Sequence, residues 1–249
     1  MTADSSVSRP EQIDELTRGI ELPLASLHEE HLALIADMIA LAWGDLVVNR
    51  ASTLATGSEA EINALLEARL SRLLDEHPLW EQLVRSVARG KETVSFNGAH
   101  LEKRPDLSIF LSSRSPAFPL VVECKLIDAP DGKSSSLYCN NGLRRFLTGE
   151  YGWSGREGFM LAYVRDHSTI ESCLLPFLAA GRAAKVDPFA VRDWPVESGH
   201  VALDLAATRH DRAFHYLNRA ASANAPGPIA IWHLWLPARI GGTSSSINA

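Results

Sequence analysis

The sequence predicts an α/β fold in which helices flank a mixed β-sheet, and three observations lead to this prediction. An amphipathic helical segment comes first, three strand-like segments follow it, and a second helical segment then precedes another apolar strand. In the helical segments apolar residues recur about every 3.6 positions. In the strand segments apolar and polar residues alternate, or a short run is continuously apolar. The segments are residues 58–75 for the first helix, 93–96, 106–111 and 119–127 for the strands, 137–148 for the second helix, and 159–164 for the last strand. This order is typical of a sheet with helices on its faces.

Further elements flank this core on both sides. Residues 27–48 form a helical pattern that is apolar on most sides, which predicts burial within the same domain or against a partner. The C-terminal third predicts a helix at 170–185, strands at 200–206 and 229–236, and a short helix at 211–220. The last of these strands is apolar on both faces, as central strands are.

The composition is that of a globular protein. The chain has 249 residues, of which 46% are apolar and 22% are charged, and this apolar content is too high for a disordered chain. We expect one domain over residues 26–240, with its core at about 56–165. Residues 1–25 are polar and include two prolines, so they are expected to be a loosely held lead-in, and residues 241–249 a flexible tail.

Membrane and secreted classes are not expected. No apolar run approaches the ~18 residues of a membrane span, and the first residues are polar without the apolar stretch of a signal peptide. The three cysteines, Cys124, Cys139 and Cys173, are odd in number and lack Cys-x-x-Cys spacing. This argues against a disulfide framework and against a cysteine zinc site. The sequence thus predicts a cytoplasmic protein without a membrane partner.

The net charge bears on nucleic-acid binding. Lys and Arg number 24 against 30 Asp and Glu, which gives a formal charge of −6. Proteins that bind nucleic acid by themselves usually carry a basic excess, because neutralising phosphates supplies most of the affinity. We therefore expect the isolated chain to bind DNA weakly, and to depend on local basic groups, on a protein partner or on a second copy of itself.

The strand at 119–127 carries charged residues inside a run that should be buried. Glu123 and Lys125 are two positions apart, so their side chains project to the same face, while Cys124 faces the other way and offers only its backbone carbonyl. Asp106 opens the preceding strand, and antiparallel pairing would place it beside Glu123. Charges are almost never buried unless they are paired or bound to a metal. Carboxylates that converge with a lysine are the groups that metal-assisted phosphodiester hydrolysis needs, since the lysine can orient or deprotonate the attacking water.

A structural interpretation of the same residues stays open. Glu123 and Lys125 also fit a simple ion pair at the end of a strand. The acid-x-Lys pattern occurs a second time at Asp131-Gly132-Lys133, in a turn-rich loop that lacks a strand to align the side chains. Spacing alone therefore does not decide between an ion pair and a catalytic site.

The first helix of the core supplies a third carboxylate. Thr56-Gly57-Ser58 is a start signal for this helix. On a helical wheel Glu59 falls close to the middle of the apolar face, whereas Glu61 lies well round on the far side. A carboxylate in the first turn that points at the core is unusual for a solvated face, and the alternative is an acid that the helix dipole favours there.

These residues resemble the motif of the PD-(D/E)XK nuclease superfamily, which has the restriction-endonuclease-like fold. The motif consists of Pro105-Asp106, sixteen further residues, and Glu123-Cys124-Lys125, with Glu59 on the first helix. The resemblance covers about residues 56–165. The stretch from Asn140 to Phe146, with Gly149-Glu150-Tyr151 and the strand after it, is similar to a stretch in several nucleases of bacterial defence systems.

The resemblance implies a fold and an activity. The fold would be an αβββαβ core, with a mixed sheet flanked by helices, an additional N-terminal helix and C-terminal strands. Asp106 and Glu123 would be metal ligands together with Cys124, Lys125 the catalytic lysine, and Glu59 an auxiliary catalytic carboxylate. The cofactor would be Mg²⁺, for which Mn²⁺ could substitute. The chain would be an endonuclease acting on DNA, as the effector subunit of an anti-phage defence system.

Two further expectations concern the surroundings of the site. Arg144 and Arg145, in the helix after the motif strand, and Arg209 and Arg212 are candidate phosphate contacts, although each taken singly also fits an exposed charged face. The alternative function is a non-catalytic subunit that uses the same fold to bind nucleic acid or a protein partner. The apolar helix at 27–48 and the negative net charge favour that alternative.

Overall fold

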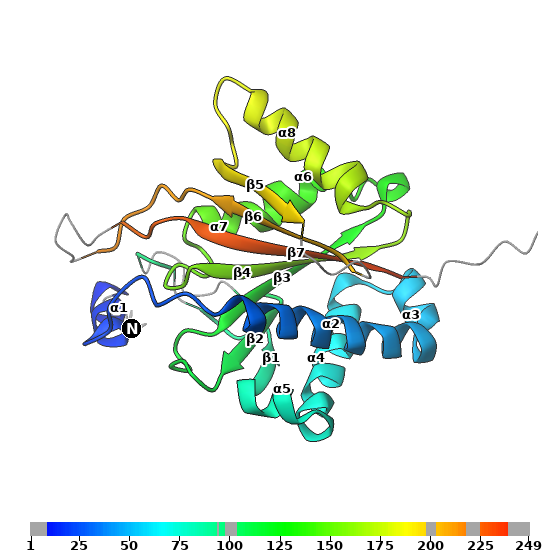
Figure 1. The fold of residues 1–249 in the computed structure, drawn as a ribbon, viewed down its shortest axis with the longest axis horizontal. Coiled ribbons are helices and arrows are strands. Elements are labelled where there is room, and N and C mark those ends of the chain that lie inside the picture. Colours follow the sequence, from blue (N-terminus) through cyan, green and yellow to red (C-terminus); the bar gives the residue numbers. More distant parts are fainter. Residues whose placement is uncertain (1–8, 94, 98–103, 198–202, 218–224, 239–249) are drawn as a thin grey trace, which may run out of the picture.

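A seven-stranded mixed sheet lies between two layers of helices in the computed structural model (Figure 1). The structure describes residues 9–93, 95–97, 104–197, 203–217 and 225–238. The strand order is β1-β2-β3-β4-β7-β6-β5. The strands are β1 (Val84–Arg89), β2 (Leu107–Leu111), β3 (Leu120–Ile127), β4 (Glu157–Val164), β5 (Val191–Glu197), β6 (Asp204–His210) and β7 (Ile229–Pro237). The predicted α/β class with a mixed sheet flanked by helices is confirmed.

Parallel strands form the centre of the sheet. β3 pairs in parallel with β4, and β4 pairs in parallel with β7. The remaining neighbours, β1 with β2, β2 with β3, β7 with β6 and β6 with β5, are antiparallel. β3 and β4 are buried on both faces because helices cover both sides of the sheet, as their largely apolar sequences predicted.

One face of the sheet is covered by the helices that precede it in the chain. These are α2 (Glu29–Asn49), α3 (Ala51–Thr56), α4 (Glu59–Glu76) and α5 (Pro78–Leu83) (Figure 1). Ser58 caps α4 by accepting a hydrogen bond from the N–H of Glu61, whose carboxylate accepts one from the N–H of Ser58. This reciprocal cap explains why the helix begins where the sequence predicted. Ile62, Leu66 and Leu70 of α4 are fully buried against the sheet.

The opposite face is covered by helices from the second half of the chain. These are α6 (Ser135–Tyr138), the π-helical turn Cys139–Leu143, α7 (Arg144–Leu147), the π-helical turn Ile170–Leu174 and α8 (Leu175–Ala183). Gly142 lies in the first of these π turns, where a Cβ atom would collide with the side chain of Met160. The predicted helix at 137–148 is present, with a local π-helical widening at Cys139–Leu143, where a larger residue at 142 would require Met160 to move.

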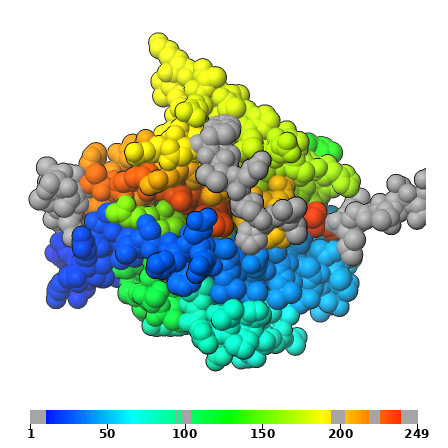
Figure 2. Space-filling view, viewed as in Figure 1, coloured from blue at the N-terminus to red at the C-terminus, as the bar shows by residue number. Residues whose placement is uncertain are grey.

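Helix α2 is long and apolar enough to cross a membrane, judged by length and composition alone. Asp37 and Asp45 interrupt its apolar run, so the sequence pattern did not predict a span here. Its buried face packs on the sheet, where Trp43 stacks on Tyr163 and donates a hydrogen bond to the carbonyl of Pro237. The other side of α2 lies at the surface, as Figure 2 shows. These contacts are those of a core helix in this fold.

Several predicted elements lie elsewhere than expected. The first strand of the sheet is β1, not residues 93–96, among which Thr93 forms only an isolated bridge and 96 lies in a turn. Of the short helix expected at 211–220, the described part, residues 211–217, is not helical. The strand expected at 200–206 is β6, which begins at Asp204 and continues to His210.

The N-terminal lead-in has more structure than its polarity predicted. Helix α1 (Arg9–Thr17) places Ile13 in a small apolar cluster, and Leu22 joins the same cluster. Phe118, Trp153, Phe214 and Tyr216 are its other buried members. The expectation of a loosely held segment is therefore wrong for these residues. The tail expected at 241–249 lies outside the described residues.

Candidate active site

The site forms where β2 stops pairing with β3. The two strands pair only at Leu120, Val121 and Val122, so the N–H groups of Cys124 and Leu126 extend beyond the reach of β2. The N–H of Cys124 donates to Oδ2 of Asp106 at 2.8 Å, and the N–H of Leu126 donates to Oε2 of Glu59 at 3.0 Å. Buried backbone N–H groups need hydrogen-bond acceptors. At this edge of β3 the carboxylates of Asp106 and Glu59 are the acceptors that replace a neighbouring strand.

Lys125 lies at the centre of three carboxylates. Its Nζ is 2.8 Å from Oε1 of Glu123, 3.3 Å from Oε1 of Glu59 and 3.7 Å from Oδ2 of Asp106. The same Nζ donates to the backbone carbonyl of Cys124 at 2.7 Å. The structure therefore brings together all four side chains that the sequence predicted. The paired register of β2 with β3 ends at Leu107 and Val122, one residue before Asp106 and Glu123, and both of these acids contact Lys125.

Glu123 is the most buried member of the group, with a side chain only 1% exposed. Its Oε1 also accepts a hydrogen bond from Nη1 of Arg145 at 3.1 Å. Its Oε2 is buried and has no hydrogen-bond partner. Burial, and then the negative charge of Asp106, raise the pKa of Glu123 from 4.5 to about 7, against the opposing effect of Lys125 and Arg145.

Lys125 is held in its charged form. Burial opposes the ammonium charge, but the carboxylates of Glu123, Asp106 and Glu59 outweigh it and raise the pKa of Lys125 above its ordinary value. A lysine with a raised pKa keeps its proton at neutral pH. In this arrangement Lys125 can stabilise negative charge or orient a water molecule, and it is poorly suited to remove a proton from that water.

Glu59 and Glu61 point in different directions, as the helical wheel predicted. The side chain of Glu59 is 32% exposed and reaches β3, whereas Glu61 is exposed to solvent and only caps α4. The α4 dipole also favours acids at both positions. The contact with Lys125 and β3 is what distinguishes Glu59 from Glu61.

Two residues that the sequence analysis did not single out hold Asp106 in place. Nδ2 of Asn63 donates to Oδ1 of Asp106 at 2.9 Å, and the hydroxyl of Tyr163 donates to Oδ1 of Asn63 at 2.7 Å. Asn63 is 3% exposed and Tyr163 is fully buried. A signal for Asn63 existed in the sequence, since it is an amide on the apolar face of α4, four residues after Glu59.

The four arginines that were predicted to contact phosphate lie in different surroundings. Arg145 joins the site through Glu123 and also donates to the hydroxyl of Tyr151 at 2.9 Å. Arg144 is exposed on α7. Arg209 lies on β6, with β4 and β7 between it and β3, and pairs with Asp193 at 3.6 Å.

Arg212 forms hydrogen bonds within the chain, contrary to the prediction that it contacts phosphate. Its guanidinium donates to the backbone carbonyls of Pro226, Gly227, Gly152 and Trp153, which join two loops. Burial lowers the pKa of Arg212 to about 10. With its donors used within the chain, Arg212 stabilises the fold and does not present a phosphate contact at the surface.

Asp106 and Glu123 are the two carboxylates of the site that could hold a divalent cation. Within the described residues there is no group of three or more His, Cys, Asp and Glu side chains that could hold a metal. Glu123 and Asp106 nevertheless lie together, and the unpartnered Oε2 of Glu123 is a buried acceptor without a donor. Mg²⁺ is commonly held by one or two carboxylates and several waters. The thiol of Cys124 belongs to the α4 side of the core, so only its carbonyl can join these carboxylates.

Comparison of the chain with protein-family models, with curated proteins and with solved structures finds no match. The contacts of Glu59, Asp106, Glu123 and Lys125 are therefore the observations that bear on function. They place three acids and one lysine at an interrupted strand edge.

Proposed function

We propose that this chain is a divalent-metal-dependent nuclease that hydrolyses phosphodiester bonds in DNA. One observation carries the proposal: three carboxylates from three separate elements converge on Lys125, while Oε2 of the buried Glu123 has no partner. A simple ion pair would need one acid. Three acids face two cations, Lys125 and Arg145, which leaves an excess of negative charge once Glu123 is ionised, and a divalent cation would offset that excess.

The order of elements supports a restriction-endonuclease-like core. Helix α4, strands β1, β2 and β3, helices α6 and α7, and strand β4 occur in the order αβββαβ, with the short helix α5 inserted between α4 and β1. Asp106 precedes β2, and Glu123 and Lys125 lie on β3, in the positions expected from the resemblance to PD-(D/E)XK nucleases. Helix α2 and strands β5, β6 and β7 would then be the additions to that core.

Each residue has a role in the proposed reaction. A divalent cation, when bound, would polarise the scissile phosphate and lower the pKa of a bound water. Asp106 and Glu123 would hold it, and the carbonyl of Cys124 could contribute. Lys125 would orient the attacking water and stabilise negative charge on the phosphate. Glu59 would keep Lys125 in position through their 3.3 Å ion pair.

The cellular setting rests on the sequence resemblance and on the charge. Similarity to nucleases of bacterial defence systems supports a role as the effector subunit of an anti-phage assembly in the cytoplasm. The net charge of −6 supports dependence on a protein partner or on a second copy for tight binding to DNA.

A second candidate function has a specific observation in its favour. Glu59 and Asp106 both accept hydrogen bonds from the backbone of β3, so both have a structural use without any metal. The exposed Leu41 and Val48 on α2 add apolar surface to a chain of negative charge. These features suit a non-catalytic subunit that binds a partner or nucleic acid through the same fold.

The test is a cleavage assay with the purified chain, alone and with any partner that copurifies with it. Single-stranded and duplex DNA are incubated with Mg²⁺, with Mn²⁺ or with EDTA. The nuclease proposal expects cutting with either metal and none with EDTA. DNA that stays intact with both metals in every preparation would support the non-catalytic function instead. Cutting that persists in EDTA would contradict the proposed dependence on a metal.

A further inference from the structure

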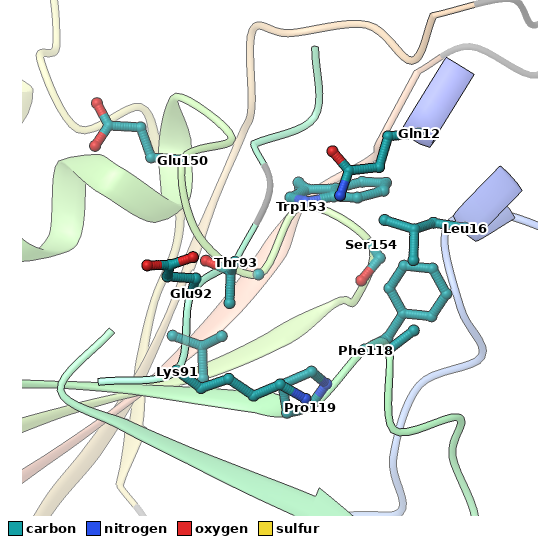
Figure 3. A pocket seen from close by; sticks show the side chains of 13 residues that line it. Gln12, Leu16, Lys91, Glu92, Thr93, Phe118, Pro119, Glu150, Trp153 and Ser154 are labelled. Atoms are coloured by element: carbon teal, nitrogen blue, oxygen red, sulfur yellow. The ribbon is translucent and has the colours of Figure 1, made fainter. Parts of the chain in front are cut away.

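A cavity of about 220 Å³ is lined in part by Val121 of β3, the strand that carries Glu123 and Lys125. Figure 3 shows Gln12, Ser154, Phe118 and Trp153 on one side of it, and Lys91 and Glu92 on the other. Its walls come from five parts of the chain, namely α1, the segment after β1, the segment before β3, β3 itself and the turn after α7. The cavity is at the scale of one heterocyclic base and is too small for a base pair.

The cavity and the site share the same strand. Val121 lines the cavity, and Glu123 follows it two positions later on the same face of β3. Side chains two positions apart on a strand are about 7 Å apart. A ligand at Val121 would therefore lie within the reach of one strand of DNA whose phosphate is held at Glu123.

Hydrogen bonds also connect the cavity wall to the site. Glu92 forms an ion pair with Arg104 at 2.5 Å, and the carbonyl of Arg104 accepts from the hydroxyl of Tyr151 at 3.0 Å. The same hydroxyl accepts from Arg145, which in turn contacts Glu123. The cavity wall and the carboxylate that would bind the metal thus belong to one connected network.

The chemistry of the walls suits a flat ring with polar edges. Phe118 and Trp153 contact each other edge-on, with ring centroids 5.7 Å apart, and form an apolar wall. The amide of Gln12 and the hydroxyl of Ser154 can each donate and accept, and the carboxylate of Glu92 accepts. Pockets that receive an unstacked base combine such apolar rings with hydrogen-bonding groups for the edge of the base.

We infer that this cavity receives one unstacked nucleobase of the DNA strand whose phosphate lies at Glu123. The inference rests on the proposed nuclease function and specifies its substrate: the strand must be single-stranded or locally unpaired at that position, because a base within a duplex cannot enter. A duplex would have to lose a base pair and a stacking contact first.

The experiment measures the fluorescence of a single base in the bound strand. Short single strands of DNA carry the fluorescent base 2-aminopurine at each successive position along the strand, and the full chain with Lys125→Met is added in Mg²⁺ so that binding is seen without turnover. Fluorescence anisotropy of an end label identifies the strands that are bound. A base that leaves its stack becomes brighter, and we expect a rise at one position only. Equal signals at all positions of bound strands would overturn the inference, and so would strands that stay unbound at every protein concentration.

Matched variants separate the cavity from the rest of the surface. Gln12→Trp fills the cavity from α1, while Glu11→Trp adds the same ring at the exposed neighbouring position. The position-specific rise should disappear with Gln12→Trp and persist with Glu11→Trp. A rise that survives Gln12→Trp would contradict a base in this cavity. Because the signal does not require cutting, failure of the nuclease proposal in the cleavage assay would be seen separately.

Discussion

The carboxylate of Glu59 forms a 3.3 Å ion pair with Lys125, although the two residues are 66 positions apart in the chain. The second oxygen of the same carboxylate accepts the N–H of Leu126. Glu59 therefore holds both the side chain of Lys125 and the backbone of β3 next to it. A change at Glu59 should act on the site through the position of Lys125.

We expect Glu59→Ala to reduce cleavage and metal affinity by the order of tenfold, the scale seen when a group that orients a metal site is removed. Extra Mn²⁺ should restore part of the rate. Titration with Mn²⁺ and initial cleavage rates measure the two effects. Glu61→Ala is the control, because Glu61 contacts only Ser58 and should affect the cap of α4 and not the site. A greater loss of activity with Glu61→Ala would contradict this assignment.

The hydrogen bonds from Tyr163 to Asn63 and on to Asp106 make a second prediction. Tyr163→Phe leaves Oδ1 of Asn63 buried without its donor, and we expect a loss of stability of about 1–3 kcal/mol. Metal affinity should fall as well, because Asp106 loses part of its support. Urea unfolding and Mn²⁺ titration measure both quantities. If stability falls while Mn²⁺ binds with unchanged affinity, Asn63 supports only the fold.

The raised pKa of Glu123 predicts how stability depends on pH. Burial, with Asp106, raises this pKa from 4.5 to about 7, so between these values the folded chain keeps a proton that the unfolded chain has lost. The contribution is therefore complete below pH 4.5 and is lost as pH rises through 7, at most of the order of 3 kcal/mol. Unfolding of the metal-free chain between pH 5 and 8 should show this decline. Glu123→Gln should flatten it, and an unchanged slope would contradict the shift.

Arg145 should affect the pH at which the site becomes active. It is one of two cations on Oε1 of Glu123, so Arg145→Gln should raise the pKa of that carboxyl further. We expect the midpoint of the pH–rate profile to move to higher pH. Arg144→Gln, at the exposed neighbouring position, should leave the midpoint in place. Equal midpoints for wild type and Arg145→Gln would show that Arg145 does not set the charge of Glu123.

Much of the site could be predicted because its residues obey simple periodicities. The two-residue period of a strand places Glu123 and Lys125 on one face, and the helical period places Glu59 against the sheet. Asn63 was not predicted as part of the site, although it obeys the same helical period. Its role depends on a hydrogen bond to Asp106, 43 positions away, and such long-range partners are not visible in a local pattern.

The missed strands have a physical cause. β1 contains a register shift between Val84 and Ser86, so its buried residues, Val84 and Val87, are three positions apart and do not alternate. β5 has two such shifts in its pairing with β6. Bulges of this kind remove the two-residue period on which strand prediction depends. The role of Arg212 was also not predicted, because the loop carbonyls that accept its hydrogen bonds leave no pattern in the sequence around it.

The most direct test of the account compares initial rates of DNA cleavage in Mg²⁺ for the wild type, Asp106→Asn and Lys125→Met. Both substitutions keep the approximate shape of the side chain, and circular dichroism and thermal unfolding check that each variant folds. The account predicts that each variant loses at least about a hundredfold in rate, the scale of removing one group that stabilises the transition state. Folded variants that both cut at the wild-type rate would contradict it.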